Sequence, residues 1–284
     1  MRPARIEDKI AEAAGARVLA LRPLSGGCVG DVFRADLASG DRVVVKAGEA
    51  GSRLDIEGDM LNALARAGLP VPAVIFAADA LLVMSYIETS GSLTEGVQEH
   101  AAELLARLHE HTAPAFGLGR DTLIGGLTQP NGWDRSWLAF FRDRRLLYMA
   151  GEAHRAGHLP ARTVGRVEKL AARLSEWIAE PARPSLIHGD AWGGNILCRK
   201  GRVAAFIDPA IYYADPEIEL AFGTLFGTFG RPFFRRYGEM RALRDGFFES
   251  RRDLYNLYPL LVHARLFGGS YVGDVERTLV RFGA

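Results

Sequence analysis

Cysteine is scarce in this sequence: its 284 residues include only two, Cys28 and Cys198. Two isolated cysteines provide neither a disulfide framework nor the spacing of a zinc site, and they fit a reducing compartment. Long apolar runs are missing too, because no segment approaches the ~20 residues of a transmembrane helix. The first residues are interrupted by charge and lack the apolar centre of a signal peptide. We therefore expect a soluble, cytoplasmic protein.

An excess of charge of either sign is also missing. The 35 Lys and Arg residues nearly balance the 34 Asp and Glu residues, which gives a formal net charge of +1. Without a basic field, the sequence predicts no nucleic-acid partner and no anionic membrane partner. The chain is 48% hydrophobic and 24% charged, which is typical of a globular protein with one large core or two modest ones.

What the sequence does contain is a polar segment between two short apolar runs that predict strands. The segment follows Ser185 and holds His188, Asp190 and Asn195, and the second run, V-A-A-F-I-D, ends at Asp208. Protein kinases space a base Asp, a metal-binding Asn and a later metal-binding Asp in this way. Phosphoryl transfer needs a carboxylate that accepts the hydroxyl proton, and oxygen ligands that hold Mg²⁺ on the nucleotide phosphates. A polar turn between strands is the alternative, and the complete spacing favours the kinase interpretation.

A glycine-rich stretch near the N-terminus, S-G-G-C-V-G from Ser25, lies between two predicted strands, and a third strand ends at Lys46. The backbone N–H groups of Gly26 and Gly27 can approach phosphate oxygens, and Lys46 can neutralise their charge. Glycine-rich hairpin turns are common, and this one departs from the strict G-x-G-x-x-G pattern. The prediction of an ATP site therefore depends on the kinase-like distance from the glycines to Lys46.

A helix is predicted next, over residues 52–68, from the helical spacing of its leucines. It carries Glu57, which we expect to pair with Lys46 as the corresponding helix glutamate does in kinases. Asp55 and Asp59 lie on the same helix and are the alternatives.

Two more predicted strands lead to a connector, where backbone groups of Ser85 and Ile87 would bind adenine. Beyond Gly91 the pattern becomes helical. The sequence therefore predicts a small β-rich ATP-binding lobe over residues 1–88 and a larger, mainly helical catalytic lobe over residues 89–284. Within the second lobe, helices are predicted over 97–111, 137–156 and 162–179, and a long aromatic loop over 116–137.

Four blocks of sequence together resemble the fructosamine kinase (ketosamine kinase) family. They are H-G-D-A-W-G-G-N from His188, I-D-P-A-I-Y-Y-A-D-P-E-I-E-L-A from Ile207, Q-P-N-G-W-D-R-S-W from Gln129 and Y-P-L-L-V-H from Tyr258. Aminoglycoside and choline kinases share the H-G-D…N…D core but not the tryptophan of the first block or the start of the second. The resemblance extends from about residue 20 to the end of the chain.

The resemblance implies an α+β, protein-kinase-like bilobal fold. It also implies ATP-dependent phosphorylation of the sugar 3-hydroxyl of ketosamines, which are ribulosamine or fructosamine adducts on amines or protein lysines. The products are unstable, so the family reverses glycation. By position, Asp190 would be the base, and Asn195 and Asp208 would be the Mg²⁺ ligands. Lys46, paired with Glu57, would position the ATP phosphates.

The resemblance further implies that Trp192 and His263 contact the substrate, although a lone histidine on an apolar helix face is usually a core residue. Glu219 stands where the family commonly has Asp, and it can accept bonds from backbone N–H groups of the catalytic loop. His109 is expected to be a capping or packing residue rather than a ligand, because no metal partner lies nearby in the sequence. Cys28 could be a redox-sensitive thiol of the phosphate loop, and buried packing is its alternative.

Two other functions remain open at this point. The first is a kinase of another small alcohol or an aminoglycoside, which would share the catalytic core. The second is an inactive binding module of kinase fold, which would usually have lost a metal or phosphate ligand, and this sequence retains them. The preferred ketosamine and the oligomeric state are not predicted.

Overall fold

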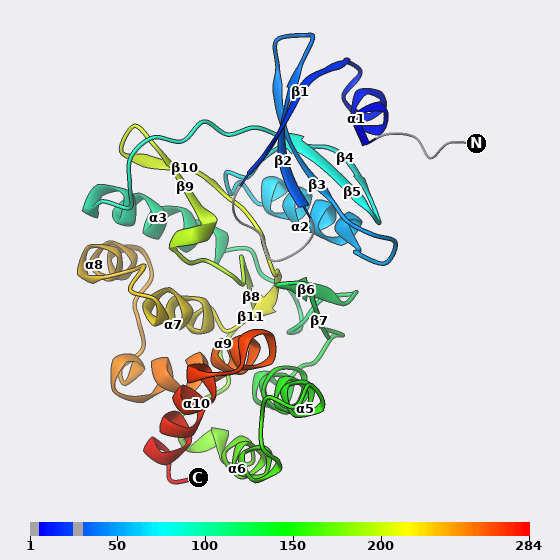
Figure 1. Ribbon diagram of the computed structural model, residues 1–284. Helices are drawn as coiled ribbons and strands as arrows, with labels where there is room; N and C mark the ends of the chain where they lie inside the picture. Colours follow the sequence, from blue (N-terminus) through cyan, green and yellow to red (C-terminus); the bar gives the residue numbers. More distant parts are fainter. Residues whose placement is uncertain (1–5, 25–30) are drawn as a thin grey trace.

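The computed structural model describes residues 6–24 and 31–284. Its N-terminal part is an antiparallel sheet in the order β1-β2-β3-β5-β4, with α1 and α2 packed on it (Figure 1). Gly26, Gly27 and Cys28, which were predicted to belong to the phosphate loop, lie outside the described residues. The elements of this part are α1 (Ile6–Ala14), β1 (Val18–Pro23), β2 (Asp31–Leu37), β3 (Arg42–Ala47), α2 (Leu54–Arg66), β4 (Val74–Ala78) and β5 (Leu81–Ser85).

The sheet has an apolar cluster on each face because side chains alternate along its strands. Val43 and Val45 of β3 pack with Ile10 of α1 on one face. Leu82 and Met84 of β5 pack against α2 on the other face. The β-branched run of β3 favours this half-buried strand geometry. The two helices therefore fix the sheet that carries Lys46.

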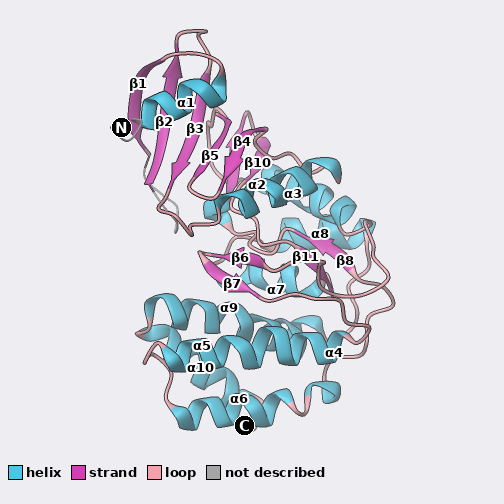
Figure 2. Cartoon of the chain, turned by 90° about the vertical axis from the view of Figure 1, so that its right-hand side faces the viewer, coloured by secondary structure: helices cyan, strands magenta, loops and turns pink. Residues whose placement is uncertain are grey.

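The second part of the chain is mainly helical and lies below the sheet in Figure 2. It surrounds one large hydrophobic core, and Ile56, Met60 and Leu64 of α2 also belong to this core. Its helices are α3 (Glu95–Leu108), α4 (Trp137–Phe140), η1 (Phe141–Leu147), α5 (Tyr148–Arg155), α6 (Ala161–Ala171), η2 (Leu174–Glu176), η3 (Gly193–Asn195), α7 (Glu217–Leu225), α8 (Arg231–Met240), η4 (Phe247–Arg251), α9 (Arg252–Phe267) and α10 (Ser270–Arg281). Its strands form three two-stranded pairs: β6 (Thr122–Ile124) with β7 (Leu127–Gln129), β8 (Ser185–Ile187) with β11 (Tyr212–Ala214), and β9 (Ile196–Arg199) with β10 (Arg202–Phe206).

The structure differs from the predicted elements in three places. The helix expected over 162–179 ends at Ala171, and Leu174 continues its apolar stripe from a short 3₁₀ turn. The helix expected over 137–156 has the predicted extent, from Trp137 to Arg155, but a π-helical segment, η1, lies within it. The loop expected over 116–137 contains the β6–β7 hairpin, whose Gly125 and Gly126 both have positive φ. Such paired glycines fit the tight two-residue turn of a hairpin.

Among the described residues, no helix combines the length and the apolar character needed to cross a membrane.

Candidate active site

The predicted catalytic segment begins at the end of β8 and returns to the same small sheet through β11. The backbone N–H of Ala210 donates to the carbonyl of His188 at 2.8 Å, which closes the loop. Gly189 has φ 86°, and a Cβ at this position would collide with the Ala210 carbonyl. Glycine is therefore required where the two ends of the segment approach each other.

Asp190 and Asn195, which were predicted from their spacing, lie in contact. The Asn195 Nδ2 donates to Oδ2 of Asp190 at 2.8 Å and to its carbonyl oxygen at 3.0 Å. Burial raises the pKa of Asp190 to about 7, the negative charge of Asp208 adds to this effect, and the Asn195 hydrogen bond opposes it. Asp190 is therefore a carboxyl group that can exchange a proton near neutral pH.

Lys46 joins the sheet to the catalytic segment. Its Nζ donates to Glu57 at 2.7 Å and to Asp208 at 2.6 Å. Burial by itself lowers the pKa of Lys46, but the attraction of Glu57 and Asp208 outweighs it and the pKa is raised. Asp55 and Asp59 instead pair with an arginine, Arg120. The predicted pairing of Glu57 with Lys46 is therefore confirmed.

Asp208 combines two features that are common at functional positions. It is a non-glycine residue with φ 53°, in the left-handed region that such residues seldom adopt. Its carboxylate and the free oxygen of the Asn195 amide are the kind of ligands that Mg²⁺ prefers. Mg²⁺ is usually held by one or two protein oxygens together with substrate phosphates, so these two residues fit that ion.

The connector residues predicted to bind adenine lie at the end of β5: Ser85 is its last residue, and Ile87 follows two positions later. The backbone N–H of Ser85 donates to the carbonyl of Ala73 at 2.9 Å, and its hydroxyl accepts from the Ala73 N–H at 2.9 Å. The Ser85 N–H is thus already used by the protein. Ile87 is half-buried and follows the last strand of the sheet.

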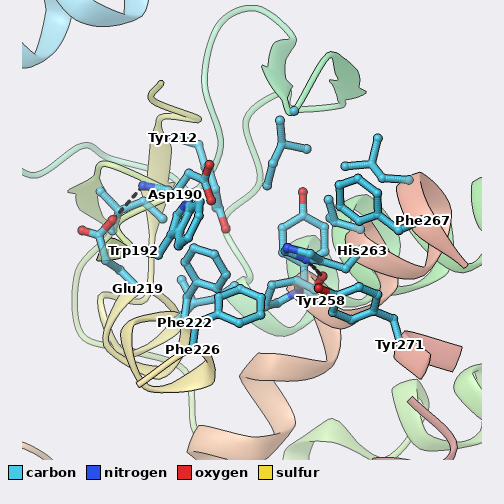
Figure 3. A pocket seen from close by; sticks show the side chains of 18 residues that line it. Asp190, Trp192, Tyr212, Glu219, Phe222, Phe226, Tyr258, His263, Phe267 and Tyr271 are labelled. Carbon is cyan, nitrogen blue, oxygen red and sulfur yellow. Dashed lines mark hydrogen bonds between the residues drawn. The ribbon is translucent and has the colours of Figure 1, made fainter. Parts of the chain in front are cut away.

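Asp190, Trp192 and His263 line one cavity of about 370 Å³ (Figure 3). Trp192 is partly exposed beside Asp190, and His263 comes from α9 on another side. The structure therefore brings together the base candidate and both predicted substrate contacts. The remaining lining residues are mostly apolar: Ile124, Gly125, Ile187, Gly189, Tyr212, Ile218, Glu219, Phe222, Phe226, Tyr258, Pro259, Val262, Leu266, Phe267 and Tyr271.

The imidazole of His263 has a defined tautomer. Its Nδ1 lies 2.7 Å from the carbonyl oxygen of Pro259, so Nδ1 carries the hydrogen and donates. Burial lowers the pKa of His263, and the ring is therefore neutral at pH 7. The other nitrogen, Nε2, is then a hydrogen-bond acceptor. His263 is a lining residue of the cavity rather than an ordinary core residue.

Glu219 anchors the catalytic loop as predicted. Its carboxylate accepts from the backbone N–H groups of His188 at 3.2 Å and Gly189 at 2.7 Å, and Nε2 of His109 lies 2.8 Å away. Burial alone raises the pKa of Glu219, but the hydrogen bond and charge of His109, the charge of His188 and the Gly189 bond lower it below its usual value. The second nitrogen of His109 contacts the hydroxyl of Tyr237 at 2.8 Å. His109, predicted to be a capping or packing residue, is the buried C-cap residue of α3.

Sequence reasoning missed most of the aromatic residues of the cavity. Phe222 and Phe226 are four residues apart, and so are His263 and Phe267. Residues at this spacing share one helix face, so the pattern was available as a signal. What could not be read from the sequence is that the faces of α7 and α9 meet beside Asp190.

Comparison with known proteins agrees with this geometry. The model of the family described as fructosamine kinase matches residues 4–282. A probable ketoamine kinase of Staphylococcus aureus is 31% identical over 267 residues, which cover 91% of each chain. The crystal structure of a putative fructosamine-3-kinase from Thermobifida fusca has a TM-score of 0.85 at 31% identity and covers 97% of this chain and 98% of its own. An aminoglycoside phosphotransferase shares the fold, with a TM-score of 0.68 at 20% identity over 99% of both chains. The predicted α+β, protein-kinase-like fold is confirmed, the chain is a phosphotransferase, and it belongs to the fructosamine kinase family.

Proposed function

We propose that this kinase uses ATP and Mg²⁺ to phosphorylate the sugar 3-hydroxyl of ketosamines. The observation that carries the proposal is the position of Asp190, which lines an aromatic cavity and is hydrogen-bonded to Asn195. The same segment ends at Asp208, which Lys46 contacts. Family membership and the names of the relatives support a ketosamine as the acceptor. A role in reversing glycation of amines or proteins is part of this proposal.

In the proposed reaction, Asp190 accepts the proton of the acceptor hydroxyl as the oxygen attacks the γ-phosphorus of ATP. The bond from this phosphorus to the β–γ bridging oxygen breaks, and ADP leaves. The Asn195 amide holds the Asp190 carboxylate in place. Asp208 and the Asn195 oxygen would hold Mg²⁺, which neutralises developing charge on the phosphates when it is bound. Lys46 would bind phosphate oxygens, and Glu57 keeps the Lys46 ammonium in position.

The remaining nucleotide contacts are proposed from the sequence. Gly26 and Gly27 would cover the phosphates, and the backbone at Ser85 and Ile87 would face the adenine. Because the Ser85 N–H is already used by Ala73, adenine would have to bond the Ser85 carbonyl or the backbone of Ile87. Residues 1–88 would then be the ATP-binding lobe and residues 89–284 the catalytic lobe.

An aminoglycoside acceptor is less well supported by the cavity. Aminoglycosides carry several ammonium groups and call for several carboxylates. Among the described lining residues, the carboxylates are Asp190 and Glu219, and Glu219 is already occupied by the catalytic loop. The cavity therefore favours an acceptor with a single cationic group.

The test is Mg²⁺-dependent ATP consumption with ribuloselysine, fructoselysine, an aminoglycoside and choline in parallel. We expect turnover on one or both ketosamines, with the phosphate located on O3 by NMR. The Asp190→Asn variant keeps the size of the side chain and should lose about 10²–10⁴-fold in turnover, the usual contribution of a general base. Turnover on the aminoglycoside or choline alone would overturn the proposed substrate, and a fully active Asp190→Asn enzyme would overturn the mechanism.

A further inference from the structure

An aromatic wall lines the cavity from the catalytic loop to helices α9 and α10. We define it as Trp192, Phe226, His263, Phe267 and Tyr271. The ring centroids are 5.8 Å apart for Trp192 and Phe226, 5.0 Å for Phe226 and His263, and 4.9 Å for His263 and Tyr271. Figure 3 shows Phe226 between Trp192 on one side and His263 on the other. The rings therefore form one continuous surface rather than scattered contacts.

Much of this wall is accessible to a ligand. Trp192 is 38% exposed, Phe226 41% and Phe267 59%. Exposed aromatic side chains that are contiguous and line a cavity are characteristic of a ligand-binding surface. Their ring faces carry partial negative charge, which attracts cations.

The charges around the cavity have one sign. Among the described lining residues there is no lysine and no arginine; of the two acidic residues, Glu219 is occupied by the catalytic loop and Asp190 is left to face the ligand. His263 offers the lone pair of a neutral imidazole, because its Nδ1–H is used by Pro259. The lining therefore carries no positive charge that would attract an anion, and its ring faces favour a cation.

In a ketosamine, the cationic amine lies close to the hydroxyl that is phosphorylated, and this proximity brings the amine to the aromatic wall. The amine is attached to C1 of the sugar, two carbons from the hydroxyl on C3. A sugar held with that hydroxyl at Asp190 keeps its amine close by, and Trp192 follows Asp190 by two residues and lines the same cavity. Secondary alkylamines are protonated at neutral pH, so the amine arrives as an ammonium group.

We propose that the aromatic wall binds the ammonium group of the ketosamine, and that the enzyme selects adducts whose amine is cationic and has no carboxylate next to it. This inference rests on the proposed function. Adducts of alkylamines and of lysine ε-amino groups meet both conditions. Adducts on the α-amino group of a free amino acid do not, because their carboxylate would lie against Asp190 and the ring faces.

The experiment compares three acceptors that differ only at C1 of the sugar: the butylamine adduct, the glycine adduct and the neutral O-butyl ether. The sugar is whichever of fructose and ribulose proves the better substrate. We expect kcat/KM for the butylamine adduct to exceed that for the ether by about tenfold, the usual size of a partly desolvated cation–π contact. The glycine adduct should be poorer than the butylamine adduct by at least the same factor.

Variants of Trp192 assign the preference to the wall. Trp192→Leu should bring the butylamine-to-ether ratio close to one, and Trp192→Phe, which keeps a ring face, should retain most of it. Trp133→Leu is the matched control, because Trp133 is also exposed but does not line the cavity. Calorimetry with the 3-deoxy forms of the butylamine adduct and the ether compares their affinities for wild type and variants without turnover.

The outcomes separate this inference from the proposed function. Equal kcat/KM for the three acceptors, or a preference for the glycine adduct, would overturn the inference and leave ketosamine phosphorylation intact. A ratio unchanged in Trp192→Leu would also overturn it. Turnover on none of the three would overturn both.

Discussion

Glu219 is the residue whose replacement tests the anchoring of the catalytic loop most sharply. In Glu219→Gln, one carboxylate oxygen becomes an NH₂ group that can only donate. The present carboxylate accepts from the backbone N–H groups of His188 and Gly189 and contacts Nε2 of His109. If His109 changes tautomer and accepts from the new amide, the His188 N–H still loses its acceptor. A buried donor without a partner costs about 1–3 kcal/mol, and that is the expected loss of unfolding free energy.

The pH dependence of this loss has a definite sign. The pKa of Glu219 is lowered in the folded protein. The carboxylate therefore stabilises the fold above its unfolded pKa, and this contribution disappears as the pH falls through the lower folded pKa. The stability difference between wild type and Glu219→Gln, measured by urea unfolding, should be present at pH 7 and decrease below about pH 4.

Activity distinguishes anchoring from general destabilisation. Glu217 lies on the same helix, is also buried, and binds Arg244 and Arg251 rather than the catalytic loop. Glu217→Gln should lose at least as much stability, because it weakens a buried ion pair. Under conditions where both variants are folded, we expect kcat to fall at least tenfold in Glu219→Gln and to stay near wild type in Glu217→Gln. Equal kcat values for the two variants would refute the anchoring argument.

Three further predictions follow from the site and its supports. Lys46→Met should lower kcat by about 10²–10³-fold, because it removes a preorganised cation from the phosphates, and near-normal steady-state turnover would contradict this. Asp190→Asn should stabilise the fold at pH 8 but not at pH 4. Burial raises the pKa of Asp190 to about 7 in the folded protein. Ionisation of Asp190 therefore destabilises the fold as the pH rises from about 4 through 7, and the Asn variant avoids this cost. Chemical denaturation at the two pH values measures this. Arg145→Met should lower the free energy of unfolding, measured in urea, by about 2–5 kcal/mol. The buried guanidinium donates to the Pro130 carbonyl and the Asn131 side chain, and a methionine leaves both acceptors unpaired. A loss below about 1 kcal/mol would contradict this.

The polar residues of the site could be predicted because phosphoryl transfer constrains their types and spacing. Asp190 and Asn195 lie five positions apart on one loop, so local chain geometry alone brings them together. The pairing of Lys46 with Glu57 was also predictable, since a buried lysine in a strand requires an acid from the helix packed on it. Asp208 was expected from the apolar run that precedes it.

The aromatic wall could not be predicted in the same way, because its members come from separate elements. Phe226 follows α7, whereas His263 and Phe267 lie on α9, and no rule of spacing says which faces of two helices will meet. Tyr212 and Tyr258 are positioned through Arg145, whose guanidinium lies 3.8 Å from the Tyr212 ring centroid and 5.5 Å from that of Tyr258. Such positions depend on the packing of the whole core.

Helix α2 packs against both the sheet and the core of the helical part, and this packing restricts movement of Glu57. In protein kinases, movement of the corresponding helix makes and breaks the lysine–glutamate pair and so switches activity. Here Ile56 and Met60 bury α2 in the core of the helical part, while Leu61 of the same helix packs against the sheet that carries Lys46. Moving Glu57 away from Lys46 would expose these side chains, at about 1.5–3 kcal/mol for each large apolar group. The pairing of Lys46 with Glu57 is thus held in place by the packing of α2 against both parts of the fold.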